Sequence, residues 1–235
     1  MKRRDLLKSG LAAGALAALP ARAFATAKAG SARDRVLFDI AKRELERAGD
    51  VIWRKDIVGI ADFGLHSALP RFHFVNLEQD SVESFRVAHG TGSDPEHDGF
   101  LNRFSNTEGS NATSRGAYVT WEWYTGRYGT SVRLGGLDPT NNAAFERYIV
   151  MHSAKYAEPE HVERWGRLGR SNGCFALGKE DFRTALLRLS GGRLLYADVL
   201  GLDEDGTQKP MPQDLQLLAA EYPRTTQERL MPGSY

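Results

Sequence analysis

The sequence predicts a mainly β protein with a few helices. Short segments rich in β-branched and aromatic residues follow one another through the middle of the chain, and turn residues separate them. Because these segments arrive in succession rather than alternating with helical patterns, a sheet assembly is favoured over repeated βα units. The composition, with 24 glycines and 10% aromatic residues in 235, is that of a globular chain.

Residues 1–25 have the pattern of a twin-arginine signal peptide. Arg3-Arg4-Asp5-Leu6-Leu7-Lys8 is followed by an apolar run over 9–19 and by Ala23-Phe24-Ala25, a small-x-small pattern suited to signal peptidase. The run is shorter than the roughly 20 apolar residues of a membrane-spanning helix, so no stable membrane anchor is expected. These features predict export by the twin-arginine machinery, cleavage near Ala25 and a periplasmic protein. The alternative is a basic, alanine-rich tail.

An amphipathic helix is predicted within residues 26–50. Ser31-Ala32-Arg33-Asp34 has the shape of a capping box, and Gly49 ends the pattern. We expect this helix to pack against the main domain. The apolar residues that recur at helical spacing are Val36, Leu37, Ile40, Ala41, Leu45 and Ala48.

The principal domain is expected over residues 51–200. A helix is predicted at 179–189, and two polar stretches, 90–115 and 153–170, are interpreted as loops. Residues 201–235 form a polar C-terminal tail with one helical candidate at 213–222. The predicted strands are 57–63, 71–77, 82–89, 117–124, 131–134, 147–152, 174–177 and 193–200.

Charge and cysteine content narrow the possible functions. The chain has 31 basic and 30 acidic residues, a formal net charge of +1, and no basic stripe that would indicate a nucleic-acid partner. Cys174 is the only cysteine, so an internal disulfide is impossible. Its thiol is therefore inert and buried, paired between molecules, or reactive.

The neighbourhood of Cys174 favours a reactive thiol. Gly173 lets a substrate approach the main chain closely, and the amides of Gly173 and Cys174 can face a developing oxyanion. A thiol nucleophile needs a base, and His152, which ends an apolar strand, is the candidate. The structural alternatives are a small buried Cys174 and a strand-end histidine with a local hydrogen bond.

A second group of titratable residues comprises His89, Asp94, His97 and Asp98, which lie within ten positions. Such clusters can bind a metal ion. This one lacks a fixed helical spacing, so we expect no metal site and assign His89 to the lining of a cleft.

His152-Ser153 and Ser171-Asn172-Gly173-Cys174 resemble the active-site motif of the YkuD-type L,D-transpeptidase family. In that motif His-Gly or His-Ser follows a strand, and Ser-x-Gly-Cys follows a loop. Over about residues 50–200 the chain also resembles one branch, the murein L,D-transpeptidase catalytic-domain proteins of Gram-negative bacteria. The shared motifs are His89-Gly90-Thr91-Gly92-Ser93-Asp94, Phe104-Ser105-Asn106, Gly109-Ser110-Asn111, Gly169-Arg170-Ser171 and Gly135 with Leu137-Asp138-Pro139-Thr140-Asn141.

The resemblance implies a β-sandwich catalytic domain, with a helix at the N-terminus and another after the cysteine, that acts on peptidoglycan stem peptides. It implies that Cys174 forms a thioester acyl-enzyme and that His152 is the base, so that 3→3 crosslinks are made without a metal or organic cofactor. A backbone carbonyl or a Ser hydroxyl would orient the histidine, with Ser171 and Ser153 as the candidates, and Asn172 belongs to the same motif.

Two positions depart from the family pattern. Asn172 stands where His is frequent, and Ala176 stands where Arg or Asn is frequent. An arginine contact to the substrate carboxylate must then come from elsewhere, and Arg170 and Arg115 are the candidates. The departures concern stem preference more than acyl transfer.

Other functions remain compatible with the sequence. An L,D-carboxypeptidase, or a hydrolase that frees a protein from peptidoglycan, would use the same thiol with water as the acceptor. A non-catalytic wall-binding module would keep the fold alone. A papain-like amidase is disfavoured, because there the cysteine precedes the histidine in the chain.

Overall fold

The computed structural model describes residues 27–28 and 30–208. The predicted signal peptide with its cleavage site, and the helical candidate at 213–222, lie outside these residues. The domain boundaries drawn from the sequence stay predictions.

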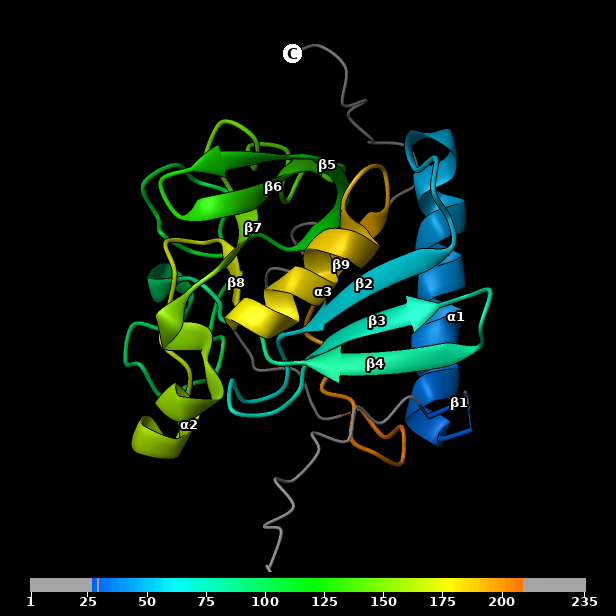
Figure 1. Cartoon of the computed structure of the whole chain (residues 1–235), viewed down its shortest axis with the longest axis horizontal. Coiled ribbons are helices and arrows are strands. Elements are labelled where there is room, and N and C mark those ends of the chain that lie inside the picture. Colours follow the sequence, from blue (N-terminus) through cyan, green and yellow to red (C-terminus); the bar gives the residue numbers. More distant parts are fainter. Residues whose placement is uncertain (1–26, 29, 209–235) are drawn as a thin grey trace, which may run out of the picture.

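Within the described residues, nine strands form one continuous sheet in the order β1-β4-β3-β2-β9-β5-β6-β7-β8 (Figure 1). Pairs β2–β9 and β7–β8 are parallel, and the other neighbours are antiparallel. The predicted mainly β fold is confirmed. In place of the two separate sheets of a sandwich, the described strands form one sheet. The strands are Ala27–Lys28 (β1), Ile57–Asp62 (β2), Phe72–Asn76 (β3), Ser81–Phe85 (β4), Gly116–Gly126 (β5), Gly129–Gly136 (β6), Val150–Ser153 (β7), Phe175–Leu177 (β8) and Leu194–Asp198 (β9).

The predicted N-terminal helix is confirmed as α1, Ala32–Ala48. The Ser31 hydroxyl oxygen accepts the Asp34 amide at 3.0 Å and caps the first turn, and Gly49 ends the helix with φ +60°. The buried residues of α1 pack with those of β2, β3, β5 and β9 in one apolar cluster. One face of the sheet is thereby covered, at the right of Figure 1.

The predicted helix after the cysteine is confirmed as α3, Lys179–Leu189. Its residues Phe182, Ala185 and Leu189 join a second apolar cluster with residues of every strand from β2 to β9. Figure 1 shows α3 crossing the sheet between the β2–β4 side and the β5–β8 side. A curved sheet wrapped around one helix explains why strands from both sides share a core.

Strand β2 shows how the two clusters divide the sheet. Ile57 and Ala61 belong to the cluster around α3, whereas Val58 and Ile60 belong to the cluster around α1. Because alternate residues of a strand point to opposite faces, β2 is buried on both sides and all six of its residues are buried. This burial accounts for its nearly continuous apolar sequence.

The two ends of the sheet meet beside Cys174. The chain leaving β4 reaches the opposite edge, where the Ala88 amide donates to the Ala176 carbonyl at 2.8 Å. The Ser171 amide donates to His89 O and the Thr91 amide donates to Ser171 O, both at 2.8 Å. These bonds pair the edge of β8 and its preceding loop with the far side of the sheet.

Two local predictions were wrong. The strand predicted at 147–152 begins only at Val150, because Tyr148 adopts φ +54° and interrupts extended backbone. The loop predicted at 153–170 contains a helix, α2, at Pro159–Trp165. None of the residues of α2 is fully buried, so it has no apolar stripe to signal a helix. Short 3₁₀ turns lie at Gly49–Val51, Thr91–Ser93 and Lys155–Ala157.

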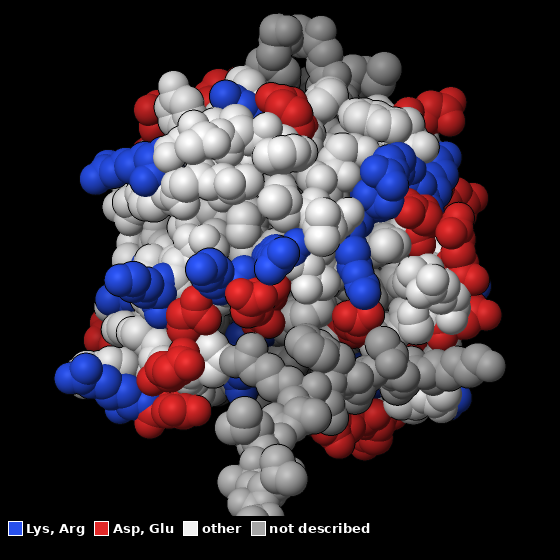
Figure 2. Space-filling model, in the orientation of Figure 1, with Lys and Arg blue, Asp and Glu red and all other residues white. Residues whose placement is uncertain are grey.

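The surface shown in Figure 2 carries both signs of charge. Lys and Arg alternate with Asp and Glu across its lower part, and a broad area over β5 and β6, in the upper part, is mostly uncharged. Among the described residues no helix is both long and apolar enough to cross a membrane.

The closure of the sheet predicts a steric requirement at Gly90. A Cβ atom there would lie 2.2 Å from Asn111 O and 2.7 Å from Gly173 N, both main-chain atoms. Gly90→Ala should therefore lower the free energy of unfolding by about 1–3 kcal/mol, as overpacking does. Urea denaturation of the purified protein measures this change.

Gly109→Ala is the control, because a Cβ there meets nothing within 4 Å although φ is +76°. Its cost should be limited to backbone strain of about 1–2 kcal/mol. A Gly90→Ala protein as stable as wild type would contradict the tight contact.

Candidate active site

His152 lies on β7, and Cys174 directly precedes the neighbouring strand β8. Strands β7 and β8 run parallel, with Met151 opposite Phe175 and His152 opposite Ala176. Met151 and Phe175 point into the core. Because side chains alternate along a strand, His152 and Cys174 share the other face of this pair. The structure thus brings the two sequence-predicted residues to one end of the sheet.

Gly173 is required by the backbone before the cysteine. It adopts φ +112°, in the left-handed region that side chains disfavour. A Cβ there would also lie 2.8 Å from both Ala112 O and Ile149 Cδ1. The loop before Cys174 therefore packs main chain against main chain, on Ala112 to one side and Gly90 to the other.

Ser171 organises the loop rather than the histidine. Its hydroxyl donates to Cys174 O at 2.6 Å and accepts the Gly173 amide at 3.1 Å. The Gly173 amide is therefore occupied, which corrects the expectation that it is free to face an oxyanion. Asn172, between them, is exposed.

His152 is oriented by a main-chain carbonyl. Its Nδ1 lies 2.9 Å from Ser153 O. A carbonyl oxygen can only accept, so Nδ1 carries the proton and Nε2 is the acceptor of the neutral ring. The side chain is 1% exposed, and this burial lowers the pKa of His152 despite the opposing bond to Ser153. The imidazole is therefore a neutral base near pH 7.

Cys174 is held as a neutral thiol. It is 7% exposed, and burial raises its pKa against opposing effects of the Val150 amide and Arg147. The sulfur donates a hydrogen bond to Tyr148 O at 3.6 Å. In this structure the S–H group thus faces a carbonyl rather than His152. Hydrogen bonds between catalytic groups are often absent or long before substrate binds.

An aromatic side chain stacks on His152, and sequence analysis did not identify it. Tyr128, from the turn between β5 and β6, stacks on the His152 ring at 4.7 Å between centroids and 21° between planes. Tyr128 is half exposed and Tyr148 is 74% exposed. A tyrosine at a hairpin tip carries no sequence signal of such a contact, because the contact depends on how the sheet curves.

Arg147 is a second residue that sequence analysis missed. Burial lowers its pKa, against a favourable electrostatic effect of Cys174. Its position inside a predicted strand gave no hint of this role. The guanidinium donates to four groups of the loop beneath Gly173, namely Ser105 O, Ser114 Oγ, Ser110 Oγ and Ala112 O.

The two arginines expected to contact a substrate carboxylate already have partners in the protein. Arg115 is nearly buried and donates to Asp198 Oδ1 at 2.7 Å. Arg170 donates to the main-chain carbonyls of Asp94 and Pro95. Both guanidinium groups therefore serve internal contacts, and neither is assigned to substrate.

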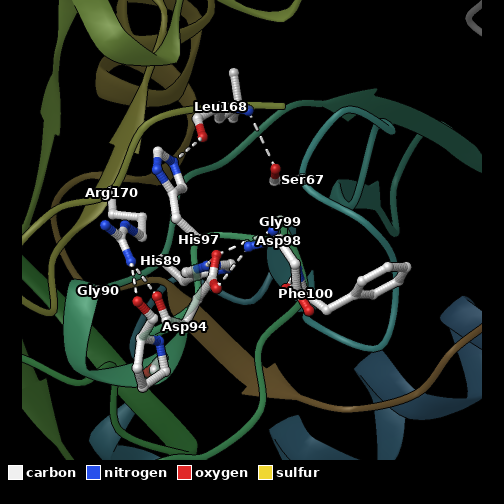
Figure 3. Close-up of polar contacts among 12 residues, drawn as sticks. Ser67, His89, Gly90, Asp94, His97, Asp98, Gly99, Phe100, Leu168 and Arg170 are labelled. Carbon is white, nitrogen blue, oxygen red and sulfur yellow. Dashed lines mark hydrogen bonds and ion pairs between the residues drawn. The ribbon is translucent and has the colours of Figure 1, made fainter. Parts of the chain in front are cut away.

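His89 does not line a cleft, contrary to expectation. It is 1% exposed, and its Nε2 lies 3.2 Å from Asp94 Oδ2 (Figure 3). His97 turns away and contacts Leu168 O. Among the residues that the structure describes, His, Cys, Asp and Glu form no group of three suited to a metal ion.

The family model described as L,D-transpeptidase catalytic domain matches residues 34–197, more than half of the chain. The model of the twin-arginine translocation pathway signal sequence matches residues 1–20. No curated protein matches the chain.

Several solved structures resemble the chain at low identity. An L,D-transpeptidase from Mycobacterium smegmatis is 14% identical, with 61% of this chain and 58% of that chain covered at a TM-score of 0.38. One from Mycobacterium tuberculosis H37Rv is 19% identical, with 61% and 57% covered at 0.35. One from Xylanimonas cellulosilytica is 13% identical, with 60% of each chain covered at 0.35. The chain spans about three-fifths of the length of these proteins.

The buried thiol predicts slow alkylation at neutral pH. The thiolate is the reactive form, so iodoacetamide should modify Cys174 with a rate that rises through a pKa above that of an ordinary cysteine. Intact-mass spectrometry measures it without ambiguity, because the chain has one cysteine.

The same protein unfolded in urea is the control, and its alkylation should follow the usual thiol pKa of about 8.5. A folded-state midpoint at or below the unfolded one would contradict the effect of burial.

Proposed function

We propose that this chain, which belongs to the L,D-transpeptidase catalytic domain family, is a peptidoglycan L,D-transpeptidase that uses Cys174 as nucleophile and His152 as base. The main support for the proposal is the parallel pairing of β7, which carries His152, with β8, which begins directly after Cys174. The fixed tautomer of His152 adds a second argument, because its accepting nitrogen is available to the thiol.

The first half of the reaction forms a thioester. The S–H group gives up its hydrogen bond to the Tyr148 carbonyl, and its proton passes to His152 Nε2. The sulfur attacks the carbonyl carbon at the L-centre of diaminopimelate in a stem peptide. The carbon–nitrogen bond then breaks, and His152 returns the proton to the amine of the departing D-alanine. Because Ser171 occupies the Gly173 amide, the Cys174 amide is the proposed oxyanion donor within the loop.

The second half transfers the acyl group. An amine of a neighbouring stem attacks the thioester, and His152 accepts its proton. The thiolate leaves and recovers that proton, which restores the neutral thiol and gives a 3→3 crosslink. Tyr128 stacks on His152, and the carbonyl of Tyr148 accepts from Cys174. Both side chains are exposed, and we propose that they line the path of the two stems.

The twin-arginine signal implies export across the membrane, and we propose the periplasm as the site of action. Peptidoglycan is accessible there, so location and reaction agree.

A carbapenem should acylate Cys174. We expect intact-mass spectrometry of the mature protein to show a gain of one drug mass in wild type and no gain in Cys174→Ala. A gain in the variant, or none in wild type, would contradict the assigned nucleophile.

Incubation with a purified tetrapeptide muropeptide tests the choice of acceptor. Crosslinked dimers are expected; tripeptide alone would indicate an L,D-carboxypeptidase with the same thiol. If neither product forms and wild type is not acylated, a wall-binding module becomes the better interpretation.

The acid limb of the pH profile should belong to His152. Its pKa is lowered by burial, so the base stays neutral to below about pH 6.5, and acylation should slow only as pH falls through that lowered value. His152→Ala should slow acylation by about 10²–10⁴ and remove this limb. Stopped-flow measurement of the acylation rate from pH 4.5 to 8 gives both the size of this decrease and the pH profile. If the acid limb of the profile persists in His152→Ala, the base is another residue.

A further inference from the structure

A buried polar network lies beneath the loop that carries Cys174, outside the reacting groups. Arg71 Nη2 lies 2.8 Å from His89 Nδ1, and His89 Nε2 lies 3.2 Å from Asp94 Oδ2. Arg71 and Asp94 are 0% exposed and His89 is 1% exposed. Three titratable side chains are rarely buried together without a reason, because each loses its hydration.

The order of donors and acceptors in this network is unambiguous. A guanidinium has no acceptor, so His89 Nδ1 must accept from Arg71. The proton of the neutral ring then sits on Nε2 and is donated to the Asp94 carboxylate. Burial, opposed by the Asp94 hydrogen bond, lowers the pKa of His89 to about 4, which keeps the ring neutral at pH 7. His89 thus joins a buried cation to a buried anion.

Asp94 is the point where the network meets the main chain. Its carboxylate accepts the amides of Asp98 at 3.0 Å and Gly99 at 3.1 Å, and its carbonyl accepts from Arg170. Figure 3 shows the Asp94 carboxylate facing the Asp98 and Gly99 amides, with Arg170 on the main-chain side. Burial opposes ionisation of Asp94, but the bonds from His89, Gly99 and Asp98 outweigh it and lower its pKa.

The network reaches the nucleophile through the segment 88–91, which pairs with the loop before β8. The His89 carbonyl accepts the Ser171 amide at 2.8 Å, and the Ser171 hydroxyl holds Cys174 O and Gly173 N. The same stretch contributes Gly90, which packs against the Gly173 backbone. A shift of His89 would therefore move the loop that sets the sulfur.

We propose that Asp94 is a positioning residue for Cys174, which it acts on through the neutral side chain of His89 and the main-chain pairing of His89 with Ser171. The proposal rests on the proposed function of Cys174 as nucleophile. It assigns no chemical step to His89 or Asp94, because neither touches the reacting atoms. A displacement of about 1 Å at a nucleophile can slow reaction by about 10²-fold.

Asp94→Asn tests the proposal with little change of shape. The carboxylate has two accepting oxygens and the new amide has one. In either orientation its NH₂ group therefore faces a donor, either His89 Nε2–H with the Gly99 amide or the Asp98 amide, and the negative charge opposite Arg71 is lost. We expect carbapenem acylation of Cys174 to slow by about 10²-fold. Iodoacetamide alkylation, which needs access rather than alignment, should become several-fold faster as the loop loosens.

Asp198→Asn is the matched control. Asp198 is also 0% exposed and pairs with an arginine, but it lies at the end of β9. It should lower the melting temperature while the folded protein keeps nearly wild-type acylation and alkylation rates.

A pair of His89 variants tests the same link if Asp94→Asn fails to fold. Glutamine can accept from Arg71 and donate to Asp94 through one amide, so His89→Gln should retain nearly wild-type acylation. His89→Leu can do neither and should slow acylation to the extent expected of Asp94→Asn.

The proposal is overturned if Asp94→Asn acylates at the wild-type rate, if Asp198→Asn slows acylation equally, or if His89→Gln and His89→Leu behave alike. If wild type itself is not acylated, the proposed function fails, and alkylation then decides the positioning role alone. An alkylation rate that rises only in Asp94→Asn and His89→Leu supports the positioning role, and equal alkylation rates in all variants reject it.

Discussion

The pairing between the chain that leaves β4 and the edge of β8 is the constraint on which the site depends. Two hydrogen bonds join Ser171 to the main chain of His89 and Thr91, and a third joins Ala88 to Ala176. Without them β8 would be a free edge of three residues, too short to hold a loop rigidly. Closing the curved sheet thus gives the nucleophile loop a partner on each side, β7 on one and residues 88–91 on the other.

This closure explains why glycine and buried charge gather in the same place. Main chain approaches main chain at Gly90 and Gly173, where a side chain would not fit. So close an approach buries carbonyl and amide groups that need partners. Arg147 supplies donors to the loop below Gly173, and Arg71 supplies donors to Val87 and Leu65 carbonyls. Both cations mainly hydrogen-bond irregular backbone, and Asp62 and Asp94 help to balance the charge of the buried Arg71.

The parts of the fold set by local pattern could be predicted, and those set by closure could not. Helix α1 has its cap and stripe in sequence, and α3 has an amphipathic repeat, so both were predicted. The Cys174 and His152 pair came from a motif with a chemical rationale. His89 was misplaced, since a strand-end histidine in a polar stretch gives no sign that the sheet closes over it. Helix α2 was missed, because none of its residues is fully buried.

The buried, protonated state of Cys174 is consistent with its place in an exported protein. A thiolate exposed outside the cytoplasm would be oxidised, and susceptibility follows thiolate character and exposure. Here burial keeps the thiol neutral, and the S–H group donates to the Tyr148 carbonyl, which is too weak a base to remove the proton. In the proposed reaction the sulfur becomes nucleophilic only when that proton moves to His152. In this proposal the thiol reacts only when a stem peptide is bound. The burial that protects the free enzyme from oxidation therefore also makes the thiol selective for acyl transfer.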